Sequence, residues 1–266
     1  MTQRERREYL INYLLDENSE YQGIELPKAD EEQKYLFRSL VNVRPPLSVS
    51  EEFLRIQDEY LIEENRSHGI TDIADLKSVA STSLSNRDLY LWRGDITTLK
   101  VDAIVNAANS GMTGCWHPNH SCIDNCIHTF AGIQLRKVCA DIMQKQGHEE
   151  PTGQSKITPA FNLPSKFVLH TVGPIVGEKL TEQNCQILAS CYKSCLDLAK
   201  ENACESIAFC CISTGVFRFP ADKAAEIAVS KVREWKKQTG DKMKVVFNVF
   251  SDKDEAIYRR ILYDKD

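Results

Sequence analysis

Six side chains of the types that bind metals lie within the fourteen residues 115–128. They are Cys115, His117, His120, Cys122, Cys126 and His128. Zinc prefers thiolate and imidazole ligands, so this stretch is the first candidate for chemistry. It has no paired CxxC motif and no second cluster elsewhere, so it does not match a zinc finger. Three interpretations stay open: a Cys-rich turn without metal, a structural site closed by a fourth ligand (Cys126, His117 or His128), and a three-ligand site with a position open for catalysis.

Two further loops carry groups suited to a phosphorylated ligand. The turn at 213–217 follows an apolar segment and precedes a helix, and backbone N–H groups in such a turn can hold phosphate. Asp95 is either a turn residue or a carboxylate that accepts a hydrogen bond from a base or a ribose. Asn106 and Asn109 frame a pair of alanines, a pattern typical neither of a turn nor of a core strand.

The segments that must position these loops alternate between strand and helix after residue 87. Strands are predicted at 89–92, 102–108, 167–172, 206–213 and 244–250, and helices at 123–146, 182–202, 221–238 and 254–262. Continuous apolar strands separated by helices indicate an α/β fold in which both faces of the sheet are covered, an α/β/α sandwich. Ligands bind such sheets at the carboxyl ends of the strands, so we expect the three loops to meet there.

The first 80 residues predict helices and contain no catalytic cluster. Thr2 and Glu5 have the spacing of a capping box, a second helix fits 31–41, and Ser48 with Glu51 predicts the start of a third. The Ser-rich stretch 78–86 is predicted to be a linker. We therefore expect residues 1–80 to be a helical appendage that is dispensable for chemistry on a generic substrate.

Composition excludes several classes of protein. The net charge is −5, divided into −7 over residues 1–86 and +2 over 87–266, so neither part has the basic excess of a duplex-binding protein. The apolar run 245–250 is far shorter than the ~20 residues of a membrane span. The N-terminal segment carries both signs of charge, unlike a signal peptide, and 10 cysteines in 266 residues are too sparse for a disulfide framework. We expect a cytoplasmic protein that binds neither nucleic acid nor membrane.

Four segments, taken together and in order, resemble the macrodomain family. They are RGDIT at 93–97, VDAIVNAAN at 101–109, VLHTVGP at 168–174 and ISTGVF at 212–217. The resemblance runs from about Leu89 to the end of the chain. It implies a three-layer α/β/α macrodomain sandwich over 87–266, with the helical N-terminal appendage at 1–80. Members of this family bind ADP-ribose, and many hydrolyse it from modified proteins.

The stretch 115–122 departs from the common macrodomain pattern, which has a glycine-rich run at this place. It looks like the zinc-dependent microbial macrodomains, whose signature is a Cys, a His five residues on and a Cys two further. The resemblance implies that Cys115, His120 and Cys122 hold one Zn²⁺ per chain. Such proteins are encoded beside a sirtuin-type ADP-ribosyltransferase that modifies a lipoyl carrier protein. The implied partner is therefore an ADP-ribosylated protein, with a lipoyl carrier protein as the candidate.

The resemblance also implies roles in substrate binding, for removal of mono-ADP-ribose from protein side chains. Asp95 and Ile96 would meet the adenine, and Asn109 would contact the distal ribose. Cys122 is assigned to the substrate site as well as to the metal. The turn that would hold the diphosphate comprises Ser213, Thr214, Gly215, Val216 and Phe217, and Phe217 would also wall off the site.

Asp124 lies where hydrolytic macrodomains place a catalytic aspartate, and Asn109 is assigned a catalytic role with it. Charge develops at the anomeric carbon of the distal ribose, as in glycoside hydrolysis, so a carboxylate and a positioned water suit the reaction. Zinc could orient the ribose hydroxyls or lower the pKa of a bound water. Asp124 could also be the N-cap of a helix that begins near Ile127.

Three alternatives to protein de-ADP-ribosylation stay open. They are hydrolysis of free O-acetyl-ADP-ribose, binding of ADP-ribose without hydrolysis, and a zinc-stabilised scaffold whose pocket is vestigial. The residues do not specify the linkage that is cleaved, which is either an ester to an acidic residue or an ether to serine.

Overall fold

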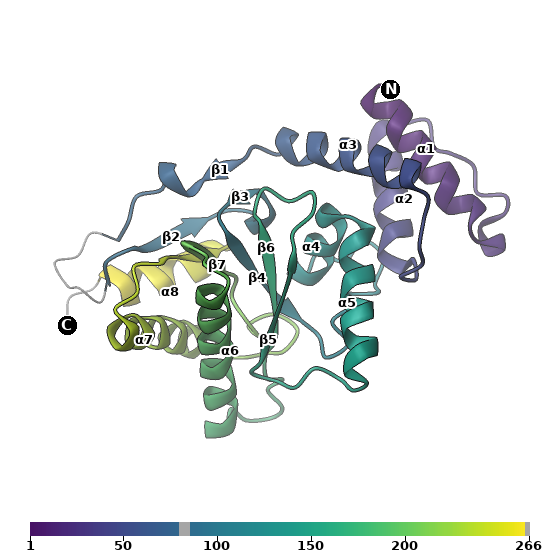
Figure 1. The fold of residues 1–266 in the computed structure, drawn as a ribbon. Helices are drawn as coiled ribbons and strands as arrows, with labels where there is room; N and C mark the ends of the chain where they lie inside the picture. The colour runs from purple at the N-terminus through teal and green to yellow at the C-terminus, as the bar shows by residue number, and fades with distance from the viewer. Residues whose placement is uncertain (80–85, 264–266) are drawn as a thin grey trace.

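A six-stranded sheet forms the centre of the molecule in the computed structural model, which describes residues 1–79 and 86–263 (Figure 1). The strand order is β2 (Leu89–Arg93), β8 (Lys244–Val249), β7 (Ser206–Phe209), β4 (Ala103–Ala108), β6 (Phe167–Val172) and β5 (Ser155–Pro159). All neighbours are parallel except β5, which pairs antiparallel with β6. The loops that follow the five parallel strands therefore leave one edge of the sheet.

Five helices cover the two faces of the sheet, which confirms the predicted α/β/α sandwich (Figure 1). On one face lie α4 (Ile123–Ala131) and α5 (Ile133–Gln146), and on the other α6 (Glu182–Glu201), α7 (Ala221–Thr239) and α8 (Asp252–Tyr263). Val105 and Leu169 are fully buried under α6, whereas Asn106 and His170 are fully buried under α4 and α5. In the described part of the chain, no helix is both long and apolar enough to cross a membrane.

All five predicted strands are present, but the prediction at 206–213 is too long, and one strand of the six-stranded sheet, β5, was missed. β7 ends at Phe209, and the chain then turns so that Ser213 adopts a left-handed φ of 64°. The edge strand β5 is half exposed and ends in Pro159, so it lacks the continuous apolar run of a buried strand. A second sheet, formed by the two-residue strands β1 (Thr71–Asp72) and β3 (Leu99–Lys100), is too short to leave a sequence pattern.

The single helix predicted over 123–146 is wrong, because Gly132 divides it into α4 and α5. Gly132 has φ 100° and ψ 167°, a conformation that is essentially restricted to glycine. A Cβ at this position would lie 2.6 Å from Gln134 Oε1, 2.8 Å from Gln57 Nε2 and 3.0 Å from Asn162 Nδ2. The break thus lets α5 leave α4 in a new direction, and the space beside it is filled by polar side chains.

The N-terminal helices α1 (Gln3–Asp16), α2 (Asp30–Val43) and α3 (Glu51–Ser67) lie beside α4 and α5 (Figure 1). They have an apolar cluster of their own, separate from that of the sheet. Its buried members are Leu10, Ile11, Leu14, Phe37, Leu40, Val41, Phe53, Ile56, Tyr60 and Leu61. Residues 80–85 of the predicted linker lie outside the described residues.

The capping box at the start of α1 is confirmed, since Thr2 Oγ1 accepts from the Glu5 N–H and Glu5 accepts from the Thr2 N–H. The predicted start of the third helix at Ser48 is wrong. The N-cap is Ser50, whose hydroxyl accepts from the Phe53 N–H over 3.1 Å. Both serines precede acidic residues, and only the local backbone conformation selects between them.

We expect Gly132→Ala to lower the free energy of unfolding by roughly 2–3 kcal/mol, because the new Cβ adopts a strained conformation and displaces buried hydrogen-bonding groups. Gly69→Ala is the matched control. Gly69 has φ 84°, but nothing lies within 4 Å of the added Cβ. The control should cost about 1 kcal/mol. Urea unfolding of both variants measures the difference, and equal losses would show that the neighbours of Gly132 contribute nothing.

Candidate functional site

The loops that carry the predicted site residues leave the carboxyl-terminal edge of the sheet. The loop at 109–122 connects β4 to α4, the turn at 213–217 follows β7, and the short 3-10 helix η4 (Ile96–Thr98) follows β2. The loops after β6 and β7 are joined where the Val176 N–H donates to the Phe217 carbonyl over 2.9 Å.

Asp124 lies within the first turn of α4 and is only 5% exposed. Its Oδ1 accepts a hydrogen bond from Asn106 Nδ2 over 2.7 Å, and its Oδ2 accepts one from Asn109 Nδ2 over 3.2 Å. Both asparagines come from the end of β4 and the residue that follows it. The structure therefore brings the two predicted catalytic residues, Asp124 and Asn109, into contact, and adds Asn106 to them.

The interpretation of Asp124 as a helix N-cap is wrong. The N-cap of α4 is Cys122, whose Sγ accepts from the Asn125 N–H over 3.4 Å. The helix begins at Ile123, in agreement with the predicted range 123–146 and not near Ile127, so Asp124 is a helical residue whose carboxylate accepts from Asn106 and Asn109.

Burial raises the pKa of Asp124 to about 6, although the hydrogen bond from Asn106, the charge of Arg136 and the hydrogen bond from Asn109 oppose the rise. His128, one turn further along α4, places Nε2 3.6 Å from Asp124 Oδ1. Burial lowers the pKa of His128 well below its usual value, so the ring is neutral. A carboxyl group that titrates near neutral pH can both accept and release a proton.

Cys115, His120 and Cys122 place their donor atoms within 4.8 Å of one another. The distance from Cys115 Sγ to His120 Nδ1 is 3.5 Å. Two ligands at the usual zinc–sulfur and zinc–nitrogen distances are about 3.6 Å apart when the metal is tetrahedral. The three donors thus fit a zinc ion in type and in spacing.

The other three metal-binding side chains of the stretch lie outside this group. Cys126 Sγ is 3.5 Å from the Arg38 guanidinium, and His117 is exposed. His128 is buried and groups instead with Cys139 and His170. Both nitrogens of His170 already have neighbours, with Thr158 Oγ1 2.9 Å from Nε2 and Asn106 Nδ2 3.2 Å from Nδ1.

The turn at 213–217 presents backbone donors. Among the described residues, the N–H groups of Gly215, Val216 and Phe217 have no hydrogen-bond acceptor, and Val216 is 73% exposed. The base of the turn is packed tightly, since a Cβ on Gly173 would lie 2.0 Å from Ser213 Oγ. A rigid turn with free N–H groups can hold an anion.

Asp95 caps η4 with one carboxylate oxygen. Oδ1 accepts from the Thr97 N–H over 2.9 Å and from Thr97 Oγ1 over 2.7 Å, which leaves Oδ2 for a ligand. Ile96 is 1% exposed and belongs to the apolar core.

The sequence assigned no role to Asn106 or Arg136. Asn106 stands in the apolar run of a predicted buried strand. A buried amide needs a hydrogen-bond partner, so its position could have indicated a buried polar group beside it. Arg136 left no such signal, because a single arginine on a predicted helix is most often solvated.

Comparison with known proteins gives a consistent result. Residues 105–228 match the model of the family described as Macro domain. A Treponema medium protein named Protein-ADP-ribose hydrolase is 68% identical over 262 residues, which cover 98% of this chain and 100% of that protein. A Trypanosoma brucei macrodomain solved in complex with ADP-ribose is similar with a TM-score of 0.66 and 30% identity, covering 84% of this chain and 94% of that one.

A fungal relative has a longer chain. The Fusarium oxysporum f. sp. cubense protein named "Probable bifunctional ADP-ribose hydrolase/ADP-ribosyltransferase" is 41% identical over 262 residues. The match covers 93% of this chain but 44% of the fungal protein.

The buried His170 makes a pH dependence of stability testable. Burial lowers its pKa to about 3, whereas an unfolded histidine titrates near 6.5. The contribution of His170 to the free energy of unfolding is therefore fully present above pH ~6.5 and is lost as the pH falls towards ~3, because at this residue only the unfolded chain takes up the proton. Between roughly pH 6 and 4, we expect the free energy of unfolding of His170→Gln to fall with decreasing pH less steeply than that of the wild type, by about 1.4 kcal/mol per pH unit.

Urea unfolding at several pH values measures the two slopes. His148→Gln, at an exposed position, is the control and should keep the wild-type slope. A His170→Gln protein whose stability falls as steeply as the wild type would contradict a neutral, buried His170.

Proposed function

The chain belongs to the macro domain family, and on that premise we propose that it is a hydrolase that releases ADP-ribose from modified proteins. The observation that carries the proposal is the buried Asp124 carboxylate, which Asn106 and Asn109 hold at the carboxyl-terminal edge of the sheet. The name of the Treponema medium relative, which this chain matches over its full length, supports the same reaction.

Three groups of contacts would bind ADP-ribose. The free Oδ2 of Asp95 accepts a hydrogen bond from the exocyclic amine of the adenine, beside Ile96. The N–H groups of Gly215, Val216 and Phe217 donate to the diphosphate, and the rest of the turn, Ser213 and Thr214, holds them in place. Asn109 then lies next to the distal ribose, whose anomeric carbon is brought towards Asp124.

Hydrolysis exchanges the bond between the anomeric carbon and a protein oxygen for a bond to the oxygen of water. The water must give up a proton, and the released side-chain oxygen takes one up if it leaves as a hydroxyl. We assign the first transfer to Asp124, as the base that receives the proton of the attacking water. Asn106 and Asn109 donate to its two oxygens and so fix the direction of the carboxylate.

Cys115, His120 and Cys122 are proposed to hold one Zn²⁺ per chain. Their donor types and the 3.5 Å between Cys115 Sγ and His120 Nδ1 support this assignment. Three protein ligands leave a position for substrate or water, where the metal supplies Lewis-acid polarisation of an oxygen or a water of lowered pKa. Cys122 is also the N-cap of α4, two residues before Asp124, so the donor group adjoins the carboxylate.

The modified substrate is proposed to be the product of a partner ADP-ribosyltransferase. Support comes from the Fusarium relative, whose name combines a hydrolase with an ADP-ribosyltransferase in one chain. A mono-ADP-ribosylated lipoyl carrier protein, modified by a sirtuin-type transferase, is the candidate that the sequence resemblance indicates.

The experiment that tests the proposal measures release of free ADP-ribose from a mono-ADP-ribosylated protein under single-turnover conditions. We expect release by the wild type and a loss of at least ~100-fold in Asp124→Ala, the magnitude typical of a lost acid–base group. Asp141→Ala, on the surface of α5 where Asp141 pairs with Lys137, should keep the rate. Calorimetry should find the ADP-ribose affinity of all three proteins within about tenfold of one another.

Two outcomes would contradict the proposal. Tight ADP-ribose binding with no release from any modified protein would indicate a binding module. Release only from O-acetyl-ADP-ribose, offered in parallel, would indicate an enzyme of free metabolites.

The metal assignment makes a separate prediction. Purified protein should contain about one zinc per chain, and Cys115→Ala or Cys122→Ala should lose it, because each removes a thiolate. Hydrolysis should fall much further than ADP-ribose affinity in both. Cys126→Ala is the matched control and should keep the metal, since Cys126 Sγ contacts Arg38 instead. Full activity in metal-free Cys115→Ala, or equal zinc loss in Cys126→Ala, would refute the three-ligand site.

A further inference from the structure

The stretch of loop that carries the three donors, residues 115–122, is held by a side chain of the N-terminal helices. Arg38, on α2, donates through Nη2 to the His120 carbonyl over 2.8 Å and to Asn125 Oδ1 over 3.0 Å. The same nitrogen lies 3.5 Å from Cys126 Sγ. Because His120 supplies one of the three donors, Arg38 fixes the backbone of a donor residue.

Asn42, one turn further along α2, holds the neighbouring residue of the loop. It is 1% exposed, its Oδ1 accepts from the Asn119 N–H over 2.9 Å, and its Nδ2 donates to Thr129 Oγ1 over 2.9 Å. Asn119 has a left-handed φ of 55°, a conformation that persists where surrounding contacts hold it. Asn42 thus ties a strained loop residue to both α2 and α4.

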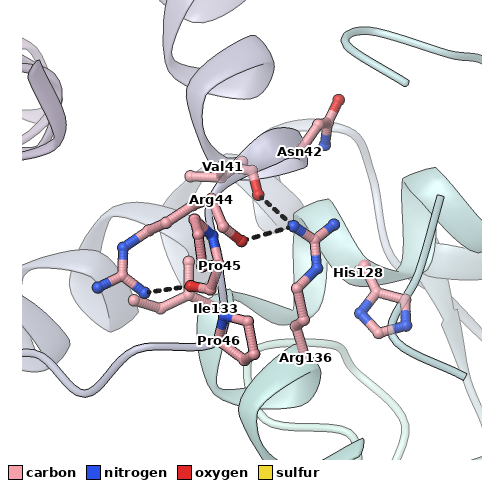
Figure 2. Close-up of a pocket in the computed structure, with 8 residues that line it drawn as sticks. All are labelled: Val41, Asn42, Arg44, Pro45, Pro46, His128, Ile133 and Arg136. Carbon is pink, nitrogen blue, oxygen red and sulfur yellow. Dashed lines mark hydrogen bonds between the residues drawn. The ribbon is translucent and has the colours of Figure 1, made fainter. Parts of the chain in front are cut away.

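Arg136 connects the beginning of the same stretch to the end of α2. Its Nη1 donates to the Val41 carbonyl over 3.1 Å and to the Arg44 carbonyl over 2.9 Å, two bonds that are drawn in Figure 2. These three residues line a cavity of ≈ 10 Å³. The guanidinium carbon lies 4.3 Å from the centre of the Trp116 ring. Trp116 directly follows the donor residue Cys115, so the last carbonyls of α2 orient the guanidinium that packs on the side chain next to this donor.

The stretch 115–122 has no regular secondary structure that would order its own backbone. Residues 115–122 contain no helix or strand, and ordering each such residue costs roughly 1–2 kcal/mol. Within the stretch, α4 itself contributes the bond from Asn125 Nδ2 to the His117 carbonyl over 2.9 Å. The bonds to the Asn119 N–H and the His120 carbonyl come from α2.

We propose that α2 is part of the active site, and that Arg38 and Asn42 are positioning residues for the metal-binding loop. They hold the backbone at 119–120 so that the Cys115, His120 and Cys122 donors stay converged before the metal binds. The inference rests on the proposed function for its effect on hydrolysis. It gives residues 1–80 a part in the chemistry, which differs from the expectation that they are dispensable.

The first test is zinc affinity, measured on the full chain by competition with a chromogenic chelator. Arg38→Ala should weaken it at least ~10-fold, in the range seen when an outer partner of a metal ligand is removed. Arg38→Lys keeps the charge but offers a single nitrogen, so it should recover part of the loss. Arg55→Ala is the matched control, because Arg55 is an exposed α3 arginine that pairs with Glu59 and should leave zinc affinity unchanged.

The second test needs no metal and no substrate. In chelator-treated protein, the backbone amides of 115–122 should exchange hydrogen at least ~10-fold faster in Arg38→Ala than in the wild type or Arg55→Ala. Exchange in the strands of the sheet should be unchanged. If Arg38→Ala does not fold, Asn42→Ala provides the same comparison, since it removes the acceptor of the Asn119 N–H.

The third test separates positioning from a loss of folded protein. In zinc-limited turnover on an ADP-ribosylated protein, Arg38→Ala should lower kcat at least ~10-fold with KM and ADP-ribose affinity within about threefold, because the proposed adenine and diphosphate contacts lie on other loops. A folded Arg38→Ala protein with wild-type zinc affinity and wild-type exchange in 115–122 would overturn the inference. If the wild-type protein binds zinc and protects the amides of 115–122 from hydrogen exchange, yet hydrolyses no ADP-ribosylated protein, the proposed function is contradicted. That outcome would not contradict the positioning role of Arg38 and Asn42.

Discussion

A carboxylate can be buried only where hydrogen bonds replace the water that it loses, and the whole site is arranged around one such group. Each oxygen of Asp124 accepts a hydrogen bond from an asparagine at the end of β4. These two bonds tie the first turn of α4 to the sheet, so the loop between them must leave at Asn109 and return at the Cys122 cap. The three sulfur and nitrogen donors lie in the loop between these two fixed ends.

The closed loop depends in turn on how α4, α5 and the N-terminal helices pack. Gly132 ends α4 and lets α5 turn away, which directs Arg136 back towards the last carbonyls of α2. Gln57 of α3 accepts from the Ile133 N–H, a donor at the start of α5 that has no partner within its own helix. The helical appendage therefore satisfies backbone groups of the macrodomain and does more than cover an apolar face.

Regular elements were predictable where a short segment contains the whole pattern. The buried strands show as apolar runs, and the capping box of α1 needs only Thr2 and Glu5. The errors have physical reasons. The half-exposed edge strand β5 has no apolar run, the break at Gly132 depends on a φ that any glycine is free to adopt or avoid, and the choice of Ser50 over Ser48 depends on the backbone between them.

The sequence by itself determined the fold class, the family resemblance and the selection of Cys115, His120 and Cys122 as candidate metal ligands, because motif spacing and hydrophobic period act over a few residues. Only the tertiary structure decided that His128 faces away from those donors, that burial shifts the pKa of Asp124, and that Arg38 reaches the His120 carbonyl. Arg38 and His120 are 82 positions apart in the chain. Contacts of that kind arise when two separately stabilised sets of helices pack together, and no local pattern records which polar side chains their packing will bring into contact.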